Sequence, residues 1–115
     1  MVKIEIILFR NHMTLEEQHR WWLEEHAPIA RKMPGLRGYV INLAGKGESG
    51  EEPEICGTDT LAFNSWDAAM KAYKSAEWRA AREHTRASGA KVLRTWIKEE
   101  VKIVSETDAA QIIGG

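Results

Sequence analysis

The sequence is poor in cysteine and has no long hydrophobic run, and each shortage excludes a class of protein. Cys56 is the only cysteine, so the chain has no internal disulfide and no cysteine-based zinc site, and a reducing compartment is favoured. The N-terminal apolar run from Ile6 to Phe9 follows the charged residues Lys3 and Glu5 and is too short for a membrane span or a signal-peptide core. We therefore expect a cytoplasmic protein that is not attached to a membrane.

An excess of charge of one sign is also missing. The 16 lysine and arginine residues nearly balance the 17 acidic residues, which gives a formal net charge of −1. Proteins that bind nucleic acid or anionic membranes carry clustered basic residues, whereas the basic residues here are scattered along the chain. Neither nucleic acid nor a membrane surface is therefore an expected partner.

The sequence lacks the residue spacings that hold metals and nucleotide cofactors. Its four histidines and one cysteine form no His-x-x-x-His or Cys-x-x-Cys pair. Gly45-Lys46-Gly47 lies between two predicted strands with no helix after it, so it is not a phosphate-binding loop. We expect no metal and no bound cofactor.

Hydrophobic periodicity predicts strands and helices in the order β-α-β-β-α-β. Apolar alternation or continuity predicts the strands, and an apolar period of about 3.6 residues predicts the helices. The predicted strands are 2–9, 36–44, 55–63 and 92–104, the last most secure over 95–103; the predicted helices are 15–26, 66–74 and 76–87, with a short helical turn over 28–33. Thr14, Ser65 and Ser75 are the expected N-caps.

This order is typical of an α+β, ferredoxin-like fold, a four-stranded antiparallel sheet with helices on one face. The length of 115 residues suits a single domain, expected over residues 1–104 and followed by a tail over 105–115. The other face of such a sheet is left bare, and a bare apolar face is an association site. We therefore expect a homodimer that packs through the exposed sheet face.

His26 is the residue that most needs an explanation. At about 100° per residue, it shares one face of the first predicted helix with Leu15, His19, Trp22 and Leu23. An imidazole is costlier to bury there than Leu or Val. One hypothesis is that the ring faces a cavity and exchanges protons with a ligand, since its ordinary pKa is near 6.5. The other is that it caps the free carbonyls at the helix end.

Several segments of the chain together resemble the EthD-like family of dimeric α+β barrel proteins. They are Trp22-x-x-x-His26-x-Pro28, Met33 to Val40, Lys3 to Arg10, Gly57 to Ser65 and Glu99-Glu100-Val101. The resemblance covers most of residues 2–104, most densely up to residue 43. It implies a pocket between sheet and helices in each protomer of a two-fold dimer, with His26 as the acid/base candidate. The family often has a Glu where this chain has Thr60, and Asp59 is expected on the opposite face of that strand, which disfavours a His–carboxylate pair.

The candidate site residues form two sets. The catalytic candidates are His26 and Tyr39, whose hydroxyl would orient a substrate if its strand turns it inward. The substrate-binding candidates are His19, Trp22, Phe9, Leu61, Arg10, Asn11 and Trp66. A place in the core is the open alternative for His19 and the tryptophans. His84 is expected on a solvated face and Cys56 in the packing of the fold.

Three functions lie within the range that the resemblance implies. The first is a cofactor-independent isomerase, cyclase or decarboxylase that acts on a small aromatic, lactone or polyketide-like metabolite by acid/base chemistry. The second is a non-catalytic EthD-like binding or stress-associated protein that holds a hydrophobic small ligand. The third is a monooxygenase on the same fold.

Overall fold

The computed structural model describes residues 1–106, so most of the expected tail, including Ile112 and Ile113, lies outside the described residues. In chain order its elements are β1 (Val2–Phe9), α1 (Leu15–Trp21), the π-helical turn η1 (Trp22–His26), α2 (Ala27–Ala30), β2 (Leu36–Leu43), β3 (Ile55–Phe63), α3 (Trp66–Tyr73), α4 (Ala76–Ala87) and β4 (Val92–Ile97). Thr14, Ser65 and Ser75 each accept a hydrogen bond from a backbone N–H three residues on, as expected of N-caps.

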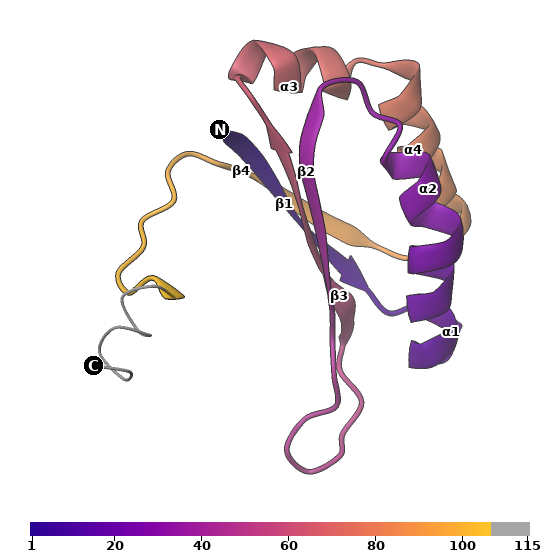
Figure 1. The fold of residues 1–115 in the computed structure, drawn as a ribbon. Helices are drawn as coiled ribbons and strands as arrows, with labels where there is room; N and C mark the ends of the chain where they lie inside the picture. The colour runs from indigo at the N-terminus through magenta and orange to yellow at the C-terminus, as the bar shows by residue number, and fades with distance from the viewer. Residues whose placement is uncertain (107–115) are drawn as a thin grey trace.

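The strands form one antiparallel sheet in the order β2-β3-β1-β4. Figure 1 shows the helices gathered on one face of this sheet, with the connection between β2 and β3 extending past its end. The core fills the space between the two layers, where Ile4, Leu61, Phe63 and Trp78 are almost fully buried. Burial contributes roughly 1.5–3 kcal/mol for each large apolar side chain. The predicted ferredoxin-like α+β fold is confirmed.

The first helical segment runs without interruption from Leu15 to Ala30, because a wide turn accommodates Pro28. The N–H of Ala27 donates to the carbonyl of Trp22, five residues back, which defines the π-helical turn. Proline has no N–H and its ring crowds the carbonyl four residues earlier in a regular helix. The wide turn places Pro28 at the start of α2, where a missing N–H costs little. The turn expected over 28–33 is therefore a continuation of the first helix.

The predicted apolar face of this helix was wrong at two positions. Leu23, expected to be buried, is 48% exposed, while Gln18 is fully buried. The Gln18 amide donates to the carbonyl of Phe9 at 2.9 Å and accepts from the N–H of Asn11 at 3.4 Å. Because these hydrogen bonds satisfy its amide, Gln18 can be buried at a position that an apolar pattern does not mark as buried. The buried face is centred on Gln18, Trp21, Trp22 and His26.

The fourth strand is shorter than predicted, since β4 ends at Ile97 instead of Val104. β4 pairs with β1 from Leu8↔Val92 to Lys3↔Ile97, and β1 itself begins at Val2. Within residues 1–106, no neighbouring strand receives further hydrogen bonds from the residues after Ile97. Figure 1 shows the following segment running away from the sheet, although Lys3 and Glu100 still form an ion pair at 3.2 Å.

The face of the sheet opposite the helices is bare but is not uniformly apolar. The Thr60 hydroxyl donates to Glu5 across β3 and β1, and the Asn42 amide donates to Thr58 across β2 and β3. Exposed Val40 and Leu93 flank these polar pairs on the edge strands. The expected association face therefore combines a polar centre with apolar margins.

Candidate active site

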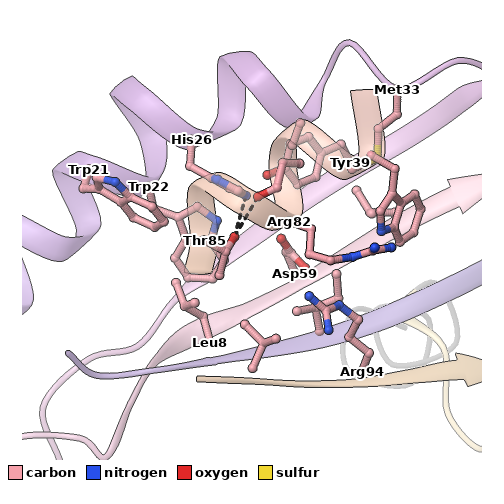
Figure 2. A pocket seen from close by; sticks show the side chains of 16 residues that line it. Leu8, Trp21, Trp22, His26, Met33, Tyr39, Asp59, Arg82, Thr85 and Arg94 are labelled. Atoms are coloured by element: carbon pink, nitrogen blue, oxygen red, sulfur yellow. Dashed lines mark hydrogen bonds between the residues drawn. The ribbon is translucent and has the colours of Figure 1, made fainter. Parts of the chain in front are cut away.

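A small cavity lies between the helices and the sheet. Its volume is about 40 Å³, whereas one water occupies about 30 Å³ in the liquid. Figure 2 shows side chains from both layers projecting toward this space. The lining residues are Ile6, Leu8, Trp21, Trp22, His26, Ala30, Met33, Tyr39, Asp59, Leu61, Trp78, Ala81, Arg82, Thr85, Val92 and Arg94. Four predicted site residues are among them: His26, Tyr39, Trp22 and Leu61.

His26 reaches the cavity from the end of η1 and is 9% exposed. Its Nδ1 lies 3.0 Å from Nδ1 of His84, so one of these nitrogens carries the hydrogen and donates it. Its Nε2 lies 3.5 Å from the Thr85 hydroxyl. The ring also stacks on Trp21 and His84. The capping alternative does not describe this ring, since its hydrogen-bond partners within residues 1–106 are side chains of α4.

Burial keeps the His26 imidazole neutral at physiological pH. Desolvation, followed by the charge of His84, lowers the pKa of His26 to about 4. A neutral imidazole can donate one hydrogen bond and accept another. With so low a pKa the ring is a weak proton acceptor at pH 7.

Asp59 brings a carboxyl group into the same cavity from β3. It is 5% exposed, and its Oδ1 has no hydrogen-bond partner among the described residues. Desolvation, reinforced by the charge of Glu5 and opposed by that of Arg94, raises the pKa of Asp59 to about 7. The group is therefore close to half protonated at neutral pH.

The sequence disfavoured a His–carboxylate pair, yet Asp59 lines the same cavity as His26. Asp59 and Thr60 do lie on opposite faces of β3, as the strand period requires. However, the Asp59 face is the one that lines the cavity, and Thr60 is hydrogen-bonded to Glu5 on the bare face. Leu61 and Phe63 share the face of Asp59 and are fully buried, so the apolar alternation of β3 was the signal that placed Asp59 inside.

Tyr39 is turned inward from β2, and its hydroxyl is buried with no hydrogen-bond partner in the described chain. Desolvation, followed by the charge of Asp59, raises the pKa of Tyr39 above its ordinary value, and the nearby Trp22 indole opposes this shift without forming a hydrogen bond of standard geometry. A buried polar group without a partner costs about 1–3 kcal/mol. Tyr39 and Asp59 thus present two such groups to one apolar cavity.

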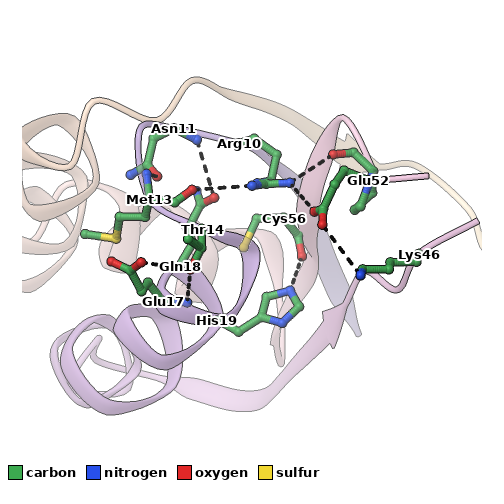
Figure 3. Close-up of polar contacts among 11 residues, drawn as sticks. Arg10, Asn11, Met13, Thr14, Glu17, Gln18, His19, Lys46, Glu52 and Cys56 are labelled. Atoms are coloured by element: carbon green, nitrogen blue, oxygen red, sulfur yellow. Dashed lines mark hydrogen bonds and ion pairs between the residues drawn. The ribbon is translucent and has the colours of Figure 1, made fainter. Parts of the chain in front are cut away.

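The other predicted site residues lie away from the cavity and organise loops. His19 Nε2 is 2.9 Å from the carbonyl oxygen of Cys56, as Figure 3 shows. Arg10 pairs with Glu52 at 3.0 Å, and the Asn11 amide donates to the carbonyl of Ser88 at 2.8 Å. These contacts tie helix α1 to β3 and the end of β1 to neighbouring loops. A satisfied structural histidine, the alternative left open for His19, describes its place.

Phe9 and Trp66 also lie outside the cavity. Phe9 follows a register shift in β1 that begins after Leu8, and Leu8 is the last β1 side chain in the lining. Trp66 is 51% exposed and packs edge-on against Trp96. Burial raises the pKa of the Cys56 thiol to about 11, which suits a packing role instead of a nucleophile.

Sequence reasoning missed the contribution of α4. Trp78, Ala81, Arg82 and Thr85 all line the cavity, and their spacing of three, four and seven residues defines a single helix face. The sequence alone shows this spacing, but Arg82 belongs to a run of charged residues that is typical of a solvated helix face. His84 was assigned to a solvated face, yet it contacts His26 directly. No local signal could show this pairing, because it joins residues 58 positions apart.

Within residues 1–106, no cluster of three or more His, Cys, Asp or Glu side chains is placed to hold a metal ion. None of the helices in that range has the length and apolar character needed to cross a membrane.

Solved structures share this fold at low sequence identity. An ethyl tert-butyl ether D (EthD) family protein from Bacillus halodurans C-125 is 19% identical, with a TM-score of 0.68, covering 88% of this chain and 100% of its own. SnoaB, a cofactor-independent oxygenase from Streptomyces nogalater, is 10% identical, with a TM-score of 0.63 and coverages of 90% and 98%. A dimeric ferredoxin-like protein of unknown function from Jannaschia sp. CCS1 is 13% identical, with a TM-score of 0.61 and coverages of 85% and 98%.

The amino-acid sequence identifies the family of this chain. No curated protein matches the chain at a significant level. The family model described as the EthD domain matches residues 10–87, a range that runs from the end of β1 through α4 and contains His26, Tyr39 and Asp59. The chain therefore belongs to the EthD domain family.

Proposed function

We propose that this protein is an enzyme that moves a proton on a small carbonyl compound bound between its helices and its sheet. The observation that carries the proposal is the pair of buried, unpartnered polar groups, the Tyr39 hydroxyl and the Asp59 carboxyl, in one apolar cavity with His26. Strongly perturbed titratable groups that converge in a cavity are typical of active sites.

The three polar groups suit different tasks. The Tyr39 hydroxyl and a neutral His26 N–H would donate hydrogen bonds to the carbonyl oxygen and stabilise the negative charge that develops there. Asp59, with a pKa of about 7, matches neutral pH and would take the proton from the carbon next to the carbonyl and return it elsewhere. The sequence-based hypothesis gave the proton transfer to His26, but a pKa of about 4 makes Asp59 the better acceptor.

The walls of the cavity favour a flat apolar substrate. Buried Trp22, Trp78 and Leu61 are among the apolar residues around the polar groups, and such walls suit a small aromatic, lactone or polyketide-like compound. Isomerisation, cyclisation, dehydration and decarboxylation of such compounds all use a stabilised enol or enolate. A ring needs more room than about 40 Å³, so substrate binding must displace the flexible side chains in the lining, Met33, Arg82 and Arg94.

We also propose a cytoplasmic homodimer that associates through the bare sheet face. The apolar margins of that face, including Val40 and Leu93, are exposed in the single chain, and one protein of the same fold is described as dimeric. Analytical ultracentrifugation of the wild type and of Val40→Lys tests this assembly. A wild-type monomer, or a variant that dimerises as well as the wild type, would contradict it.

Tyr39→Phe removes the hydroxyl alone and so tests the proposed chemistry. We expect deuterium exchange at the α-carbon of 2-indanone in D₂O, followed by proton NMR, to fall by roughly 10²-fold. The free energy of unfolding should stay level or rise, because the removed hydroxyl has no partner within residues 1–106. The matched control is His12→Gln, at an exposed position outside the cavity lining. Equal exchange rates in Tyr39→Phe and the control would refute the role of Tyr39.

The same assay separates the two other functions that the sequence left open. A non-catalytic binding protein would bind 2-indanone without exchange and would tolerate His26→Gln. A monooxygenase, an activity suggested by the oxygenase SnoaB on the same fold, would consume oxygen when a phenolic substrate is added, which an oxygen electrode measures.

A further inference from the structure

Two arginines stand at the boundary between the cavity and a second hollow that opens to the surface. Arg82 comes from α4 and Arg94 from β4, and both line the inner cavity. Both also line the outer hollow, about 180 Å³ in volume, together with Thr85, Arg86, Ala90 and Val92. Among the described residues, four line both spaces: Arg82, Arg94, Thr85 and Val92.

Neither guanidinium has an anionic partner in the part of the chain that the structure describes. Arg82 lies over the ring of Tyr73, with 5.3 Å from its Cζ to the ring centroid, and neither arginine forms an ion pair within residues 1–106. Arg10 and Arg86, by contrast, pair with Glu52 and Glu83 at 3.0 and 3.2 Å.

The two arginines also repel one another. Desolvation and then the positive charge of Arg82 lower the pKa of Arg94, while Tyr73 and Asp59 act in the opposite direction. Arg82, which is half-buried, and Arg94, which is exposed, are therefore within electrostatic range of one another. Two like charges held together attract an anion to the space between them. The Asp59 carboxyl does not supply that anion by contact, since it forms no ion pair with either arginine.

We propose that Arg82 and Arg94 clamp the carboxylate of the substrate, which makes the substrate of the proposed enzyme a small carboxylic acid. This inference rests on the proposed function, which accounts for the other part of the substrate. The carboxylate of the substrate lies in the outer hollow, and its carbonyl-bearing part reaches Tyr39 and Asp59. A guanidinium is a planar fork of donors that matches a carboxylate.

The sizes of the two spaces agree with this division. A hollow of about 180 Å³ exceeds the roughly 150 Å³ that accommodates benzene in an engineered protein cavity. The inner cavity, at about 40 Å³, is smaller than that volume. As the arginine side chains turn to meet a carboxylate, the boundary between the two spaces opens, so that one ligand extends from the clamp to the polar groups inside.

Benzoate and its neutral analogue benzamide test the clamp by isothermal titration calorimetry. We expect benzoate to bind the wild type at least tenfold more tightly than benzamide. Arg82→Gln and Arg94→Gln should each weaken benzoate binding on the order of tenfold, the effect of losing a charge-assisted hydrogen bond. Arg79→Gln is the matched control, since Arg79 is exposed on the same helix and lines neither space.

Three other outcomes overturn the clamp. Equal affinity for benzoate and benzamide, or arginine variants that bind like Arg79→Gln, shows that the pair does not select a carboxylate. Inorganic phosphate bound as tightly as benzoate contradicts the assignment to a carboxylic acid. Benzoate binding that follows the expected pattern, together with no deuterium exchange at the benzylic carbon of phenylpyruvate, which carries both a carboxylate and a ketone, would defeat the proposed chemistry and leave the clamp standing.

Discussion

Gly57→Ala is expected to destabilise the protein by about 3 kcal/mol or more, because the position has no room for a methyl group. A Cβ at Gly57 would lie 2.1 Å from the backbone carbonyl oxygen of Asn42 and 2.9 Å from the ring of Trp22. The first contact is with backbone on the paired strand β2, so a rotamer change cannot relieve it. The second contact would displace Trp22, which is fully buried and lines the cavity.

Urea denaturation of Gly57→Ala and Gly45→Ala measures this effect. Gly45 is the matched control, since a Cβ there has no atom within 4 Å, and its replacement should change the free energy of unfolding by less than about 0.5 kcal/mol. If both variants unfold at the same urea concentration as the wild type, then β2, β3 and Trp22 are not packed as closely as described.

Most of the fold could be predicted from the sequence because its signals are local. Strands β1 and β3 have the bounds that alternation indicated, and α4 begins at the cap supplied by Ser75. The end of β4 could not be predicted this way. Its residues after Ile97 keep a strand-like pattern, but the length of β1, a distant segment, decides where pairing stops.

The site was only partly predictable for the same reason. His26 and Tyr39 were found from their places on a helix and a strand, and both line the cavity. Arg10 and His19 lie outside the cavity because their polar side chains turn toward backbone carbonyls, Arg10 toward Met13 in a loop and His19 toward Cys56 in β3. Asp59 needed one further step, the observation that Leu61 on the same face would be buried.

Asp59→Asn is expected to make the protein more stable at alkaline pH and less active. In the folded protein the pKa of Asp59 is raised from 3.8 to about 7, so folding favours the protonated form and stability falls as pH rises from about 4 to 7. The slope is about 1.4 kcal/mol per pH unit, and the loss above pH 7 is on the order of 4 kcal/mol. Asparagine has the same shape and no charge, so the variant avoids this loss.

His26 gives the pH dependence an opposite component. Its pKa is lowered from 6.5 to about 4, so its contribution to stability rises with pH over that interval and is lost on acidification. In the wild type the two slopes nearly cancel between pH 4 and 6.5. The variant lacks the Asp59 slope, so its free energy of unfolding should climb by about 1.4 kcal/mol per unit over the same range.

Urea unfolding at pH 4, 6 and 8 measures how the free energy of unfolding changes with pH. The matched control is Asp67→Asn, which removes an exposed carboxylate. The gap between Asp59→Asn and the wild type should be absent near pH 4 and widest at pH 8. Tyr39 of β2, Arg94 of β4, Arg82 of α4 and His26 of η1 line the cavity with Asp59. Of the charged groups, Glu5 of β1 raises the pKa of Asp59 from the bare face and Arg94 lowers it. A gap that does not widen with pH would mean that Asp59 ionises in the folded protein as it does in water.

Exchange kinetics then decide which group carries the proton. If Asp59 is the acceptor, the wild-type rate rises with pH through about 7 and Asp59→Asn loses roughly 10²–10⁴-fold. If His26 is the acceptor, the rate rises near pH 4 and the asparagine variant keeps its activity. A variant that gains stability at pH 8 while it loses exchange would identify Asp59 as a carboxyl that is buried at a cost to the fold for the sake of the reaction.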